Sequence, residues 1–485
     1  MTLFPLVLLL LAGLTVSVAP AEASPSKPKF VATSADSIQP RFSWGVSTYA
    51  ARCEGGDLSL RVRKGKGWKS RLGGRKSRGG GYGARLKLDE GQSVRVKFTL
   101  KRGGLTKRFW VRCLPEDFPG YSFQRFRPGG PGLFSVGLDG RFATVFNRNG
   151  VPIWWYRGIG AMDTKVLADG TLGWNTNTRQ IGGEFEVRSL TGRLLRTVGT
   201  DENADFHDLQ LLPNGNYLFG AFDNYQRGID ASEFGGKSDA LTQSTVIQEV
   251  TPEGRVVSSW DPADHTGLAE TGRWWDVLLS NEGHFWYDVS HWNAVEPDGK
   301  FMYLSYRHLD AIYKVNRKSG RVIWKLGGTE TPKSLKVLNH PGGDYPFGGQ
   351  HDVRVQPNGS ITVFNNRTGQ ADSTPRAERF RINEDAGTAR LVESVEDGFV
   401  PALDCCGSSS RLRSKEWLVS WGDSDIVGAY DRDGRTIFWL DAATYKANPV
   451  PGGSVSVAEL RRAMDRSAID RRAVEIGMSK MGTPS

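Results

Sequence analysis

Three of the seven histidines occupy equivalent points of repeated sequence phrases. His207 stands in Phe-His-Asp, His291 in Ser-His-Trp-Asn and His351 in Gln-His-Asp, each a few residues before a turn. A neutral imidazole is a competent nucleophile near pH 7, because its unperturbed pKa is about 6.5. Imidazoles are also common metal ligands. The three side chains therefore predict either a site for nucleophilic and acid–base chemistry or a metal site.

Two further polar residues accompany His291. Asn293 follows it by two positions, and alternation along a strand puts both side chains on one face. Arg307 follows on the next strand of the same repeat. A guanidinium group matches the planar fork of sulfate or phosphate oxygens, which predicts an oxyanion site. The other four histidines are interpreted as ordinary core or surface residues: His265, His284, His308 and His340.

The histidines belong to a longer repeat that must position them. Each version has a strand, a Gly-containing turn, a second strand and an apolar or Trp-rich closing strand. The versions begin at Phe134, Thr164, Phe206, His291, Gln350 and Cys405. Hairpin signals recur at Asp139-Gly140, Asp169-Gly170, Asn214-Gly215, Asp298-Gly299 and Asn358-Gly359. About four strands in each of six units predict an all-β, six-bladed β-propeller whose first strands line a central channel. An immunoglobulin-like array is the competing interpretation, but it needs longer repeats.

The chain divides further at both ends. Short alternating runs between about Ser37 and Leu114 predict a small β-sandwich-like domain. Apolar residues at helical spacing from about Ser456 to Met478 predict a surface helix. The predicted division is a signal peptide (1–23), a basic β-sandwich-like domain (24–118), a linker (119–132), the propeller (133–452), and a C-terminal helix and tail (453–485).

The first residues and the cysteines predict export. An apolar run from Leu6 to about Val18 precedes Ala21-Glu22-Ala23, which is typical of a signal-peptide cleavage site. A membrane anchor is the alternative, but the run is too short and broken. In an exported chain, cysteines favour disulfides. Cys53 and Cys113 are expected to close the N-terminal domain, whereas the adjacent Cys405 and Cys406 form either a vicinal pair or free thiols.

Positive charge is concentrated near the N-terminus. Between Arg52 and Arg112 there are 19 Lys and Arg against four Asp and Glu, a net of +15 in a chain of net charge +10. Basic patches bind nucleic acid in many proteins. For an exported chain, an anionic cell-envelope polymer or lipid surface is the preferred partner, and no nucleic acid is expected. A solvated basic domain with no specific ligand is the simplest interpretation.

Four segments closely resemble the bacterial arylsulfotransferase family, in the family's order: HDLQLLPNGN, SHWNAVEPDG, SYRHLDAIYKVNRKSGRVIWKLGG and QHDVRVQPNGSITVFNN. The resemblance implies an exported six-bladed propeller that moves a sulfuryl group from a phenolic sulfate donor to a phenolic acceptor. It implies that His351 is the transiently sulfated nucleophile, that His207, His291 and Arg307 hold the sulfate oxygens, and that Asn293 is a supporting contact. It also implies no cofactor, metal or nucleotide donor. Tyr306 and His308, on either side of Arg307, depart from the family pattern.

Two other functions compete with this interpretation. Three converging imidazoles match the ligand set of a metal-dependent hydrolase, although a fixed cation at Arg307 opposes a divalent ion. A propeller that binds a ligand or partner without catalysis is the second alternative. Ser408 to Ser410 lack the surroundings of a nucleophilic serine and are expected to form a turn. The sequence carries no signal for an oligomeric state.

Overall fold

Strands make up most of the regular structure in the computed structural model. It describes residues 27–32, 38–53, 55–63, 65–76, 81–176, 183–200, 203–280 and 286–467. The all-β class predicted from the sequence is confirmed. The predicted signal peptide (1–23) lies outside the described residues. Within those residues, no helix has the length and apolar character needed to cross a membrane.

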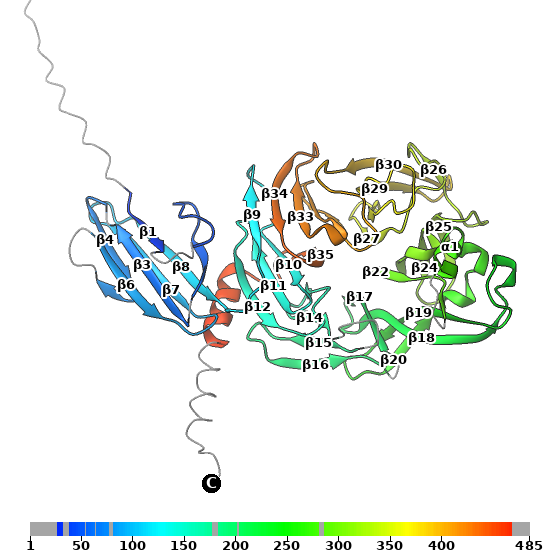
Figure 1. Cartoon of the computed structure of the whole chain (residues 1–485), viewed down its shortest axis with the longest axis horizontal. Helices are drawn as coiled ribbons and strands as arrows, with labels where there is room; N and C mark the ends of the chain where they lie inside the picture. Colours follow the sequence, from blue (N-terminus) through cyan, green and yellow to red (C-terminus); the bar gives the residue numbers. More distant parts are fainter. Residues whose placement is uncertain are drawn as a thin grey trace, which may run out of the picture.

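Six mainly antiparallel sheets follow one another from residue 133 onward and surround a common centre in Figure 1. The first contains β10 (Leu133–Leu138), β11 (Phe142–Asn147) and β12 (Pro152–Arg157), joined by β35 (Thr444–Pro449). The second contains β13 (Lys165–Val166), β14 (Leu172–Asn175), β15 (Phe185–Arg188) and β16 (Leu194–Val198). The third contains β17 (Asn203–Leu211), β18 (Tyr217–Ile229), β19 (Ala240–Val250) and β20 (Val256–Trp260), with β21 (Tyr287–Asp288) beside β19.

The other three sheets repeat this order. The fourth contains β22 (Trp292–Asp298), β23 (Phe301–Tyr306), β24 (Ala311–Asn316) and β25 (Val322–Gly327). The fifth contains β27 (His351–Val355), β28 (Ile361–Asn365), β29 (Arg376–Asn383) and β30 (Thr388–Val395), with β26 (Lys336–Leu338) on its edge. The sixth contains β31 (Ser408–Arg411), β32 (Trp417–Ser420), β33 (Ile426–Tyr430), β34 (Thr436–Asp441) and β9 (Ser122–Arg125). Ser408 to Ser410 thus lie in a strand rather than in the expected turn.

Two strand pairings bring a strand from near one end of the chain into a sheet formed near the other end. β35, near the C-terminus, pairs with β10 of the first sheet. β9, from the segment predicted to be a linker, pairs with β34 of the sixth sheet, where Phe123 packs on Phe438 with ring centroids 5.1 Å apart. The linker prediction missed this strand because its alternation is short and lies among Pro and Gly. Closing a sheet assembly with strands from both ends ties the termini together.

The turns and cores follow the sequence pattern. All five predicted Asx-Gly turns connect paired strands, and each glycine has a positive φ, from +57° at Gly299 to +86° at Gly215. Glycine adopts this conformation without the steric cost that a Cβ brings. Apolar clusters lie between neighbouring sheets; one combines Leu218 of the third sheet with Trp292 and Leu304 of the fourth.

Two further sheets lie towards the N-terminus. One contains β1 (Lys29–Ala32), β3 (Asp57–Arg63) and β6 (Gly81–Lys87). The other contains β2 (Thr48–Arg52), β8 (Thr106–Leu114), β7 (Ser93–Leu100), β4 (Trp68–Leu72) and β5 (Arg75–Lys76). Burial alternates along β3 and β7, so the apolar side chains share one core while most Lys and Arg side chains face outward. The predicted Cys53–Cys113 disulfide is confirmed.

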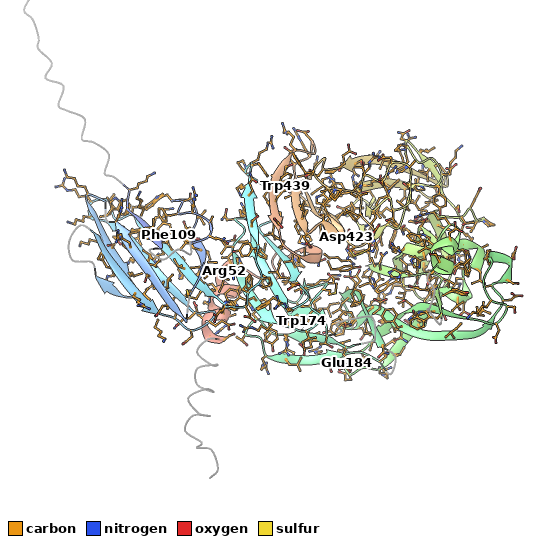
Figure 2. The ribbon with its side chains drawn as sticks, viewed as in Figure 1. Arg52, Phe109, Trp174, Glu184, Asp423 and Trp439 are labelled. Carbon is orange, nitrogen blue, oxygen red and sulfur yellow. A yellow bond between two sulfur atoms is a disulfide. The ribbon has the colours of Figure 1, made fainter. Side chains whose placement is uncertain are left out.

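A helix over residues 457–467 lies between these sheets and the first of the six (Figure 1). Its Leu460 and Met464 are buried in the core of the first sheet, as the helical spacing predicted. On its other side, Arg112 of β8 pairs with Asp465, and Arg461 lies over the ring of Trp110. Figure 2 shows Arg52 near this helix, between the N-terminal sheets and the first of the six sheets. The rest of the predicted C-terminal helix lies outside the described residues.

The remaining helical elements are short. They are η1 (Ser232–Phe234), η2 (Pro262–Asp264), η3 (Leu268–Thr271), α1 (Trp274–Ser280), η4 (Arg307–Leu309) and η5 (Gly422–Ser424). Among them, α1 and η4 approach the histidines described next.

Candidate active site

The three repeat histidines lie in or beside strands that have irregular pairing: His207 within β17, His351 at the start of β27 and His291 directly before β22. The register shifts between Ala204 and Leu209 in β17, and between His351 and Arg354 in β27. His291 immediately precedes β22 and has a φ of +49°. Simple alternation, which predicted that His291 and Asn293 share one face, therefore fails at this irregular pairing. Such bulges redirect individual side chains and are frequent beside active sites.

Two of the histidines are each backed by a carboxylate. Nδ1 of His207 contacts Oδ1 of Asp205, and Nδ1 of His291 lies 2.5 Å from Oδ2 of Asp288. The two imidazole rings meet edge to face with centroids 5.3 Å apart. Burial lowers the pKa of His207, although Asp205 opposes that shift. Burial alone would raise the pKa of Asp288, but His291 holds it below its usual range. In both pairs the carboxylate fixes the ring orientation and leaves Nε2 available for another partner.

Arg307 lies in η4 against an aromatic and imidazole support. Its guanidinium carbon is 4.2 Å from the ring centroid of Trp274. One terminal nitrogen donates to Nε2 of His308 (2.7 Å) and the other to the carbonyl of Asp404 (2.7 Å). The Nε–H is buried and has no hydrogen-bond partner among the described residues. A buried donor without a partner is costly, so Arg307 presents a place for an anionic oxygen.

His308 is a member of the site that the sequence interpretation missed. Its Nδ1 donates to the carbonyl of Asp288 (2.6 Å), so its Nε2 is the acceptor that holds Arg307. Its ring lies 4.7 Å from the rings of both His291 and Trp274. Burial lowers the pKa of His308 to about 3, which keeps it neutral. The sequence shows that His308 follows Arg307 directly, but a single histidine gives no signal of its hydrogen bonds to Arg307 and Asp288.

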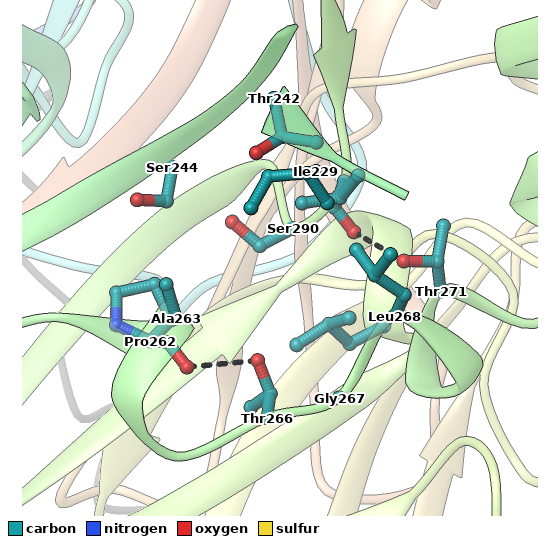
Figure 3. A pocket seen from close by; sticks show the side chains of 12 residues that line it. Ile229, Thr242, Ser244, Pro262, Ala263, Thr266, Gly267, Leu268, Thr271 and Ser290 are labelled. Atoms are coloured by element: carbon teal, nitrogen blue, oxygen red, sulfur yellow. Dashed lines mark hydrogen bonds between the residues drawn. The ribbon is translucent and has the colours of Figure 1, made fainter. Parts of the chain in front are cut away.

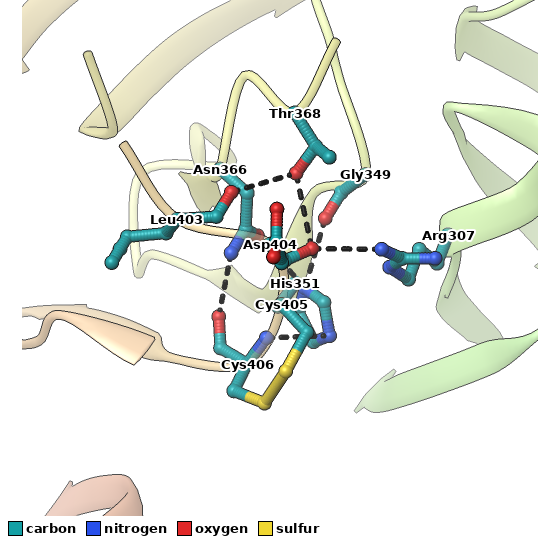
Figure 4. Close-up of a disulfide and its surroundings, with 9 residues drawn as sticks. All are labelled: Arg307, Gly349, His351, Asn366, Thr368, Leu403, Asp404, Cys405 and Cys406. Atoms are coloured by element: carbon teal, nitrogen blue, oxygen red, sulfur yellow. Dashed lines mark hydrogen bonds between the residues drawn. A yellow bond between two sulfur atoms is a disulfide. The ribbon is translucent and has the colours of Figure 1, made fainter. Parts of the chain in front are cut away.

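The ring of His351 is fixed by three hydrogen-bond partners. Nδ1 lies 2.9 Å from the carbonyl of Gly349 and 2.8 Å from Oδ1 of Asn366. The amide nitrogen of Asn366 donates to the carbonyl of Cys406, which orients Oδ1 towards the histidine. Because both neighbours of Nδ1 are acceptors, Nδ1 carries the proton and Nε2 carries the lone pair. Nε2 accepts a long hydrogen bond (3.3 Å) from the backbone N–H of Cys406 (Figure 4).

The electrostatic environment keeps His351 neutral. The side chain is 1% exposed. Burial lowers its pKa well below the usual value, and the positive charges of Arg307 and Lys446 lower it further. A neutral imidazole with a defined lone pair is the form that acts as a nucleophile.

Asp310 connects the Arg307 turn to the histidine strand. It ends η4 at a φ of +45°, and its buried carboxylate accepts from the backbone N–H of Gly349, 2.6 Å away, two residues before His351. Arg273 and the hydroxyl of Tyr345 also donate to it. One carboxylate thus holds the turn that carries Arg307 against the segment that precedes His351.

Tyr445 and Lys446, from the closing strand β35, complete the centre. The ring of Tyr445 lies 5.7 Å from that of His207 and 6.5 Å from that of His351. Its buried hydroxyl has no hydrogen-bond partner among the described residues. Lys446, fully buried, donates to the carbonyls of His207 (2.7 Å) and Asn293 (2.9 Å). Neither residue had a signal in the sequence, because β35 joins the first sheet from the far end of the chain.

Asn293 lies beneath the site rather than in its pocket. Its amide nitrogen donates to the carbonyl of Gln350 (2.8 Å), directly before His351. Its Oδ1 is buried without a partner in the described part of the chain. The side chain therefore spans β22 and β27.

The aspartates that follow two of the histidines form buried ion pairs. Asp208 pairs with Lys165 and with Arg354 (2.8 Å). Asp352, at a φ of +59°, pairs with the same Arg354 (2.6 Å). These buried pairs connect the inner strands of several sheets beneath the site, which fixes the histidines relative to one another.

A pocket with a volume of about 270 Å³ opens at this centre. Its polar lining is His207, Gln243, Asp288, His291, Arg307 and His308, and its apolar lining is Phe222, Val277, Leu278 and Trp286. His351 does not line this pocket and lies beside it. The mixture of cationic, imidazole and apolar groups suits an anion attached to an aromatic ring.

A second pocket is lined by Ser290, the residue directly before His291 (Figure 3). Ser290 and Leu309 line it, together with small hydroxyl and aliphatic side chains. None of its lining residues is charged. A sulfate or phosphate group has no counter-charge there.

The metal alternative meets a chemical obstacle. Among the described residues, one group of possible ligands lies within 4.8 Å: Asp288, His291 and His308. It is not the predicted set of three repeat histidines. Arg307 already donates to Nε2 of His308, so a divalent cation there would face a guanidinium group. The residues do not suit a bound metal ion.

Fold and site together define an all-β protein with a histidine- and arginine-containing pocket at the centre of its sheets. The family model for arylsulfotransferases (ASST) matches residues 137–402, more than half of the chain. The chain belongs to the arylsulfotransferase family. Membership supports an arylsulfotransferase-like function with small aryl sulfate and phenol substrates. No curated protein matches the chain.

Solved structures resemble the chain distantly. A protein of unknown function from Bacteroides caccae has 11% identity and a TM-score of 0.42, over 66% of this chain and 100% of its own. A catalytically inactive virginiamycin B lyase from Staphylococcus aureus, solved with quinupristin, has 10% identity and a TM-score of 0.35, over 70% and 91%. Kluyveromyces lactis Hsv2 has 8% identity and a TM-score of 0.33, over 75% and 97%.

Proposed function

We propose that this protein transfers a sulfuryl group from an aryl sulfate to a phenolic acceptor through a covalent intermediate on Nε2 of His351. The observation that carries the proposal is the fixed tautomer of His351. Two acceptors, on Gly349 and Asn366, hold the Nδ1 proton and leave a lone pair on Nε2. Family membership supports the class of reaction.

In the first step, Nε2 attacks the sulfur atom in line with the aryl oxygen. The Nε2–S bond forms, the S–O bond to the ring breaks, and its electron pair leaves on the phenolate oxygen. Negative charge spreads over the other sulfuryl oxygens, as in phosphoryl transfer. The unpartnered Nε–H of Arg307 supports its role as the principal counter-charge, and His207 faces the same pocket.

His291 is the proposed acid for the leaving phenolate. Asp288 on its Nδ1 stabilises an imidazolium, which donates from Nε2 into the pocket. A phenol has a pKa near 10, so protonation assists its departure. In the second step the neutral His291 accepts the proton of an acceptor phenol, whose oxygen attacks the sulfur and releases His351. The result is a ping-pong cycle that uses no nucleotide sulfate donor.

The surroundings of the site are part of the proposal. We propose that the six sheets are the blades of a six-bladed β-propeller and that the N-terminal sheets form a β-sandwich-like domain. The chain is proposed to be exported, consistent with two disulfides. The outward-facing cations of the N-terminal sheets, among them Arg61, Arg63, Lys69 and Arg71, support binding to an anionic cell-envelope surface.

The test is a burst experiment with a chromogenic aryl sulfate. Mixing with enzyme should release one equivalent of phenol per site, and a phenolic acceptor should then sustain turnover. His351→Asn should abolish both, and intact-mass measurement should find a sulfuryl adduct on the wild type alone. EDTA should change neither phase. Loss of activity in EDTA would favour the metal-dependent hydrolase, and binding of aryl sulfates without any release would favour the non-catalytic alternative.

A further inference from the structure

One loop, residues 403–406, contacts both Arg307 and His351 (Figure 4). The carbonyl of Asp404 accepts from Arg307 (2.7 Å), and the N–H of Cys406 donates to Nε2 of His351 (3.3 Å). The carbonyl of Cys406 accepts from Asn366, the residue that fixes the His351 tautomer. A change in this loop therefore reaches the counter-charge and the nucleophile together.

The loop is closed by a disulfide between neighbouring residues, Cys405 and Cys406. A bond between adjacent side chains makes a small ring that includes the peptide between them, so their torsions no longer vary independently. Cys406 has a φ of +73°, a left-handed conformation that costs an L-residue about 1 kcal/mol or more. The ring holds the N–H of Cys406 in the direction that faces His351.

That N–H lies close to the position that the sulfuryl group must reach. Its 3.3 Å contact with Nε2 is longer than an ordinary hydrogen bond, so it yields readily as sulfur approaches. Once the Nε2–S bond forms, the sulfuryl oxygens surround Nε2 and come within reach of the same donor. A backbone N–H that is already positioned where negative charge develops stabilises the transition state.

We propose that the vicinal Cys405–Cys406 disulfide holds the Cys406 N–H as a donor to the sulfuryl oxygens on His351, so that full activity requires the oxidised bond. The inference rests on the proposed sulfuryl transfer. Cys406 contributes the donor, and the disulfide acts as a positioning element. A dithiol such as dithiothreitol reduces the Cys405–Cys406 disulfide by supplying two electrons and two protons. The S–S bond breaks, two thiols form and the reductant becomes a cyclic disulfide.

The two disulfides differ in access. Cys405 and Cys406 are half-buried, whereas Cys53 and Cys113 are buried in the N-terminal core. Mild dithiothreitol should therefore reduce the vicinal pair first. Thiol alkylation and peptide mass mapping of each sample identify which pair has opened.

The experiment measures the phenol burst of the full chain, oxidised and after mild reduction. Reduction of Cys405 and Cys406 should slow the burst by about 100-fold, the effect of removing one such donor, with unchanged amplitude and little change in KM. Cys405→Ser combined with Cys406→Ser should show the slow burst and no further response to dithiothreitol. Cys53→Ala combined with Cys113→Ala is the matched control and should keep the full response.

Three results separate the hypotheses. An unchanged burst rate after mapped reduction overturns the inference while the proposed function stands. A slower burst accompanied by loss of the near-ultraviolet circular dichroism signal also overturns it, because the disulfide would then merely maintain the fold. Absence of any burst from the oxidised protein refutes the proposed function itself. If the serine variant does not fold, reduced wild type carries the test.

Discussion

Oδ1 of Asn366 lies 2.8 Å from Nδ1 of His351 and accepts a hydrogen bond from it, so the lone pair lies on Nε2. The amide cannot turn around without losing its own hydrogen bond to the carbonyl of Cys406. Gly349 supplies a second acceptor at the same nitrogen. Control of the tautomer is thus shared between one side chain and one backbone carbonyl.

Replacing Asn366 with Leu should lower the burst rate by about tenfold or more, because the Nδ1 proton loses one of its two acceptors. The Nε2-protonated tautomer, which has no lone pair to attack sulfur, then becomes more populated. Stopped-flow measurement of phenol release gives the rate. Asn358→Ala, in an exposed turn of the same sheet, is the matched control and should leave it unchanged. A normal rate in Asn366→Leu would mean that Gly349 alone fixes the ring.

Arg307→Lys should lower kcat by about 100-fold while the protein stays folded. Lysine keeps the positive charge but loses the planar set of donors shared between His308, Asp404 and the pocket. Steady-state kinetics with a saturating aryl sulfate provide the measurement. Arg317→Lys, at a partly buried pair with Glu249 that does not line the pocket, should behave as wild type. Equal loss in both variants would contradict a specific role for Arg307.

The repeats made much of the architecture predictable. Asx-Gly turns located five hairpins, and the helical spacing of Leu460 and Met464 located the helix after the last sheet. The strand β9 escaped prediction, because only its pairing with β34 shows that it belongs to a sheet.

The site was predictable where it coincides with the repeat. His207 and His291 meet at the centre as their equivalent positions indicate. Tyr445 and Lys446 lie outside the repeat phrases and reach the site through the pairing of β35 with β10, a contact between distant parts of the chain. The support that His308 gives Arg307 depends on a tautomer, which residue type alone does not specify.

Tyr445→Phe should lower the burst rate by about tenfold without loss of stability. The hydroxyl has no partner among the described residues, so its removal breaks no hydrogen bond in the free protein. Any loss of rate then reports a contact made with the substrate. Tyr430→Phe is the converse control, because that hydroxyl joins Trp421 and Asp397 at 2.7 Å each. It should cost about 1–3 kcal/mol of stability and little activity. Full activity in Tyr445→Phe would exclude its hydroxyl from the reaction.

Acid should destabilise the fold in a way that His308→Gln reduces. Burial lowers the pKa of His207, His308 and His351, that of His308 to about 3. An unfolded histidine takes up a proton near pH 6.5, so below that pH the unfolded chain binds protons that the native state excludes. The free energy of unfolding therefore decreases as the pH is lowered. For His308 this loss of stability continues until the native residue protonates near pH 3.

Burial raises the pKa of two carboxyl groups, Glu296 and Asp425, which act in the opposite direction, so the acid effect must be measured as a difference between two proteins. Burial raises the pKa of Glu296 to about 7, so its contribution to stability grows as pH falls from 7 towards its unfolded value. Wild type and His308→Gln share this contribution, and it cancels in their difference. Urea unfolding at pH 6 and pH 5 should give a dependence about 1.2 kcal/mol per pH unit shallower in the variant. Identical dependences would show that His308 is protonated in the native protein, and a protonated ring could not accept the hydrogen bond from Arg307.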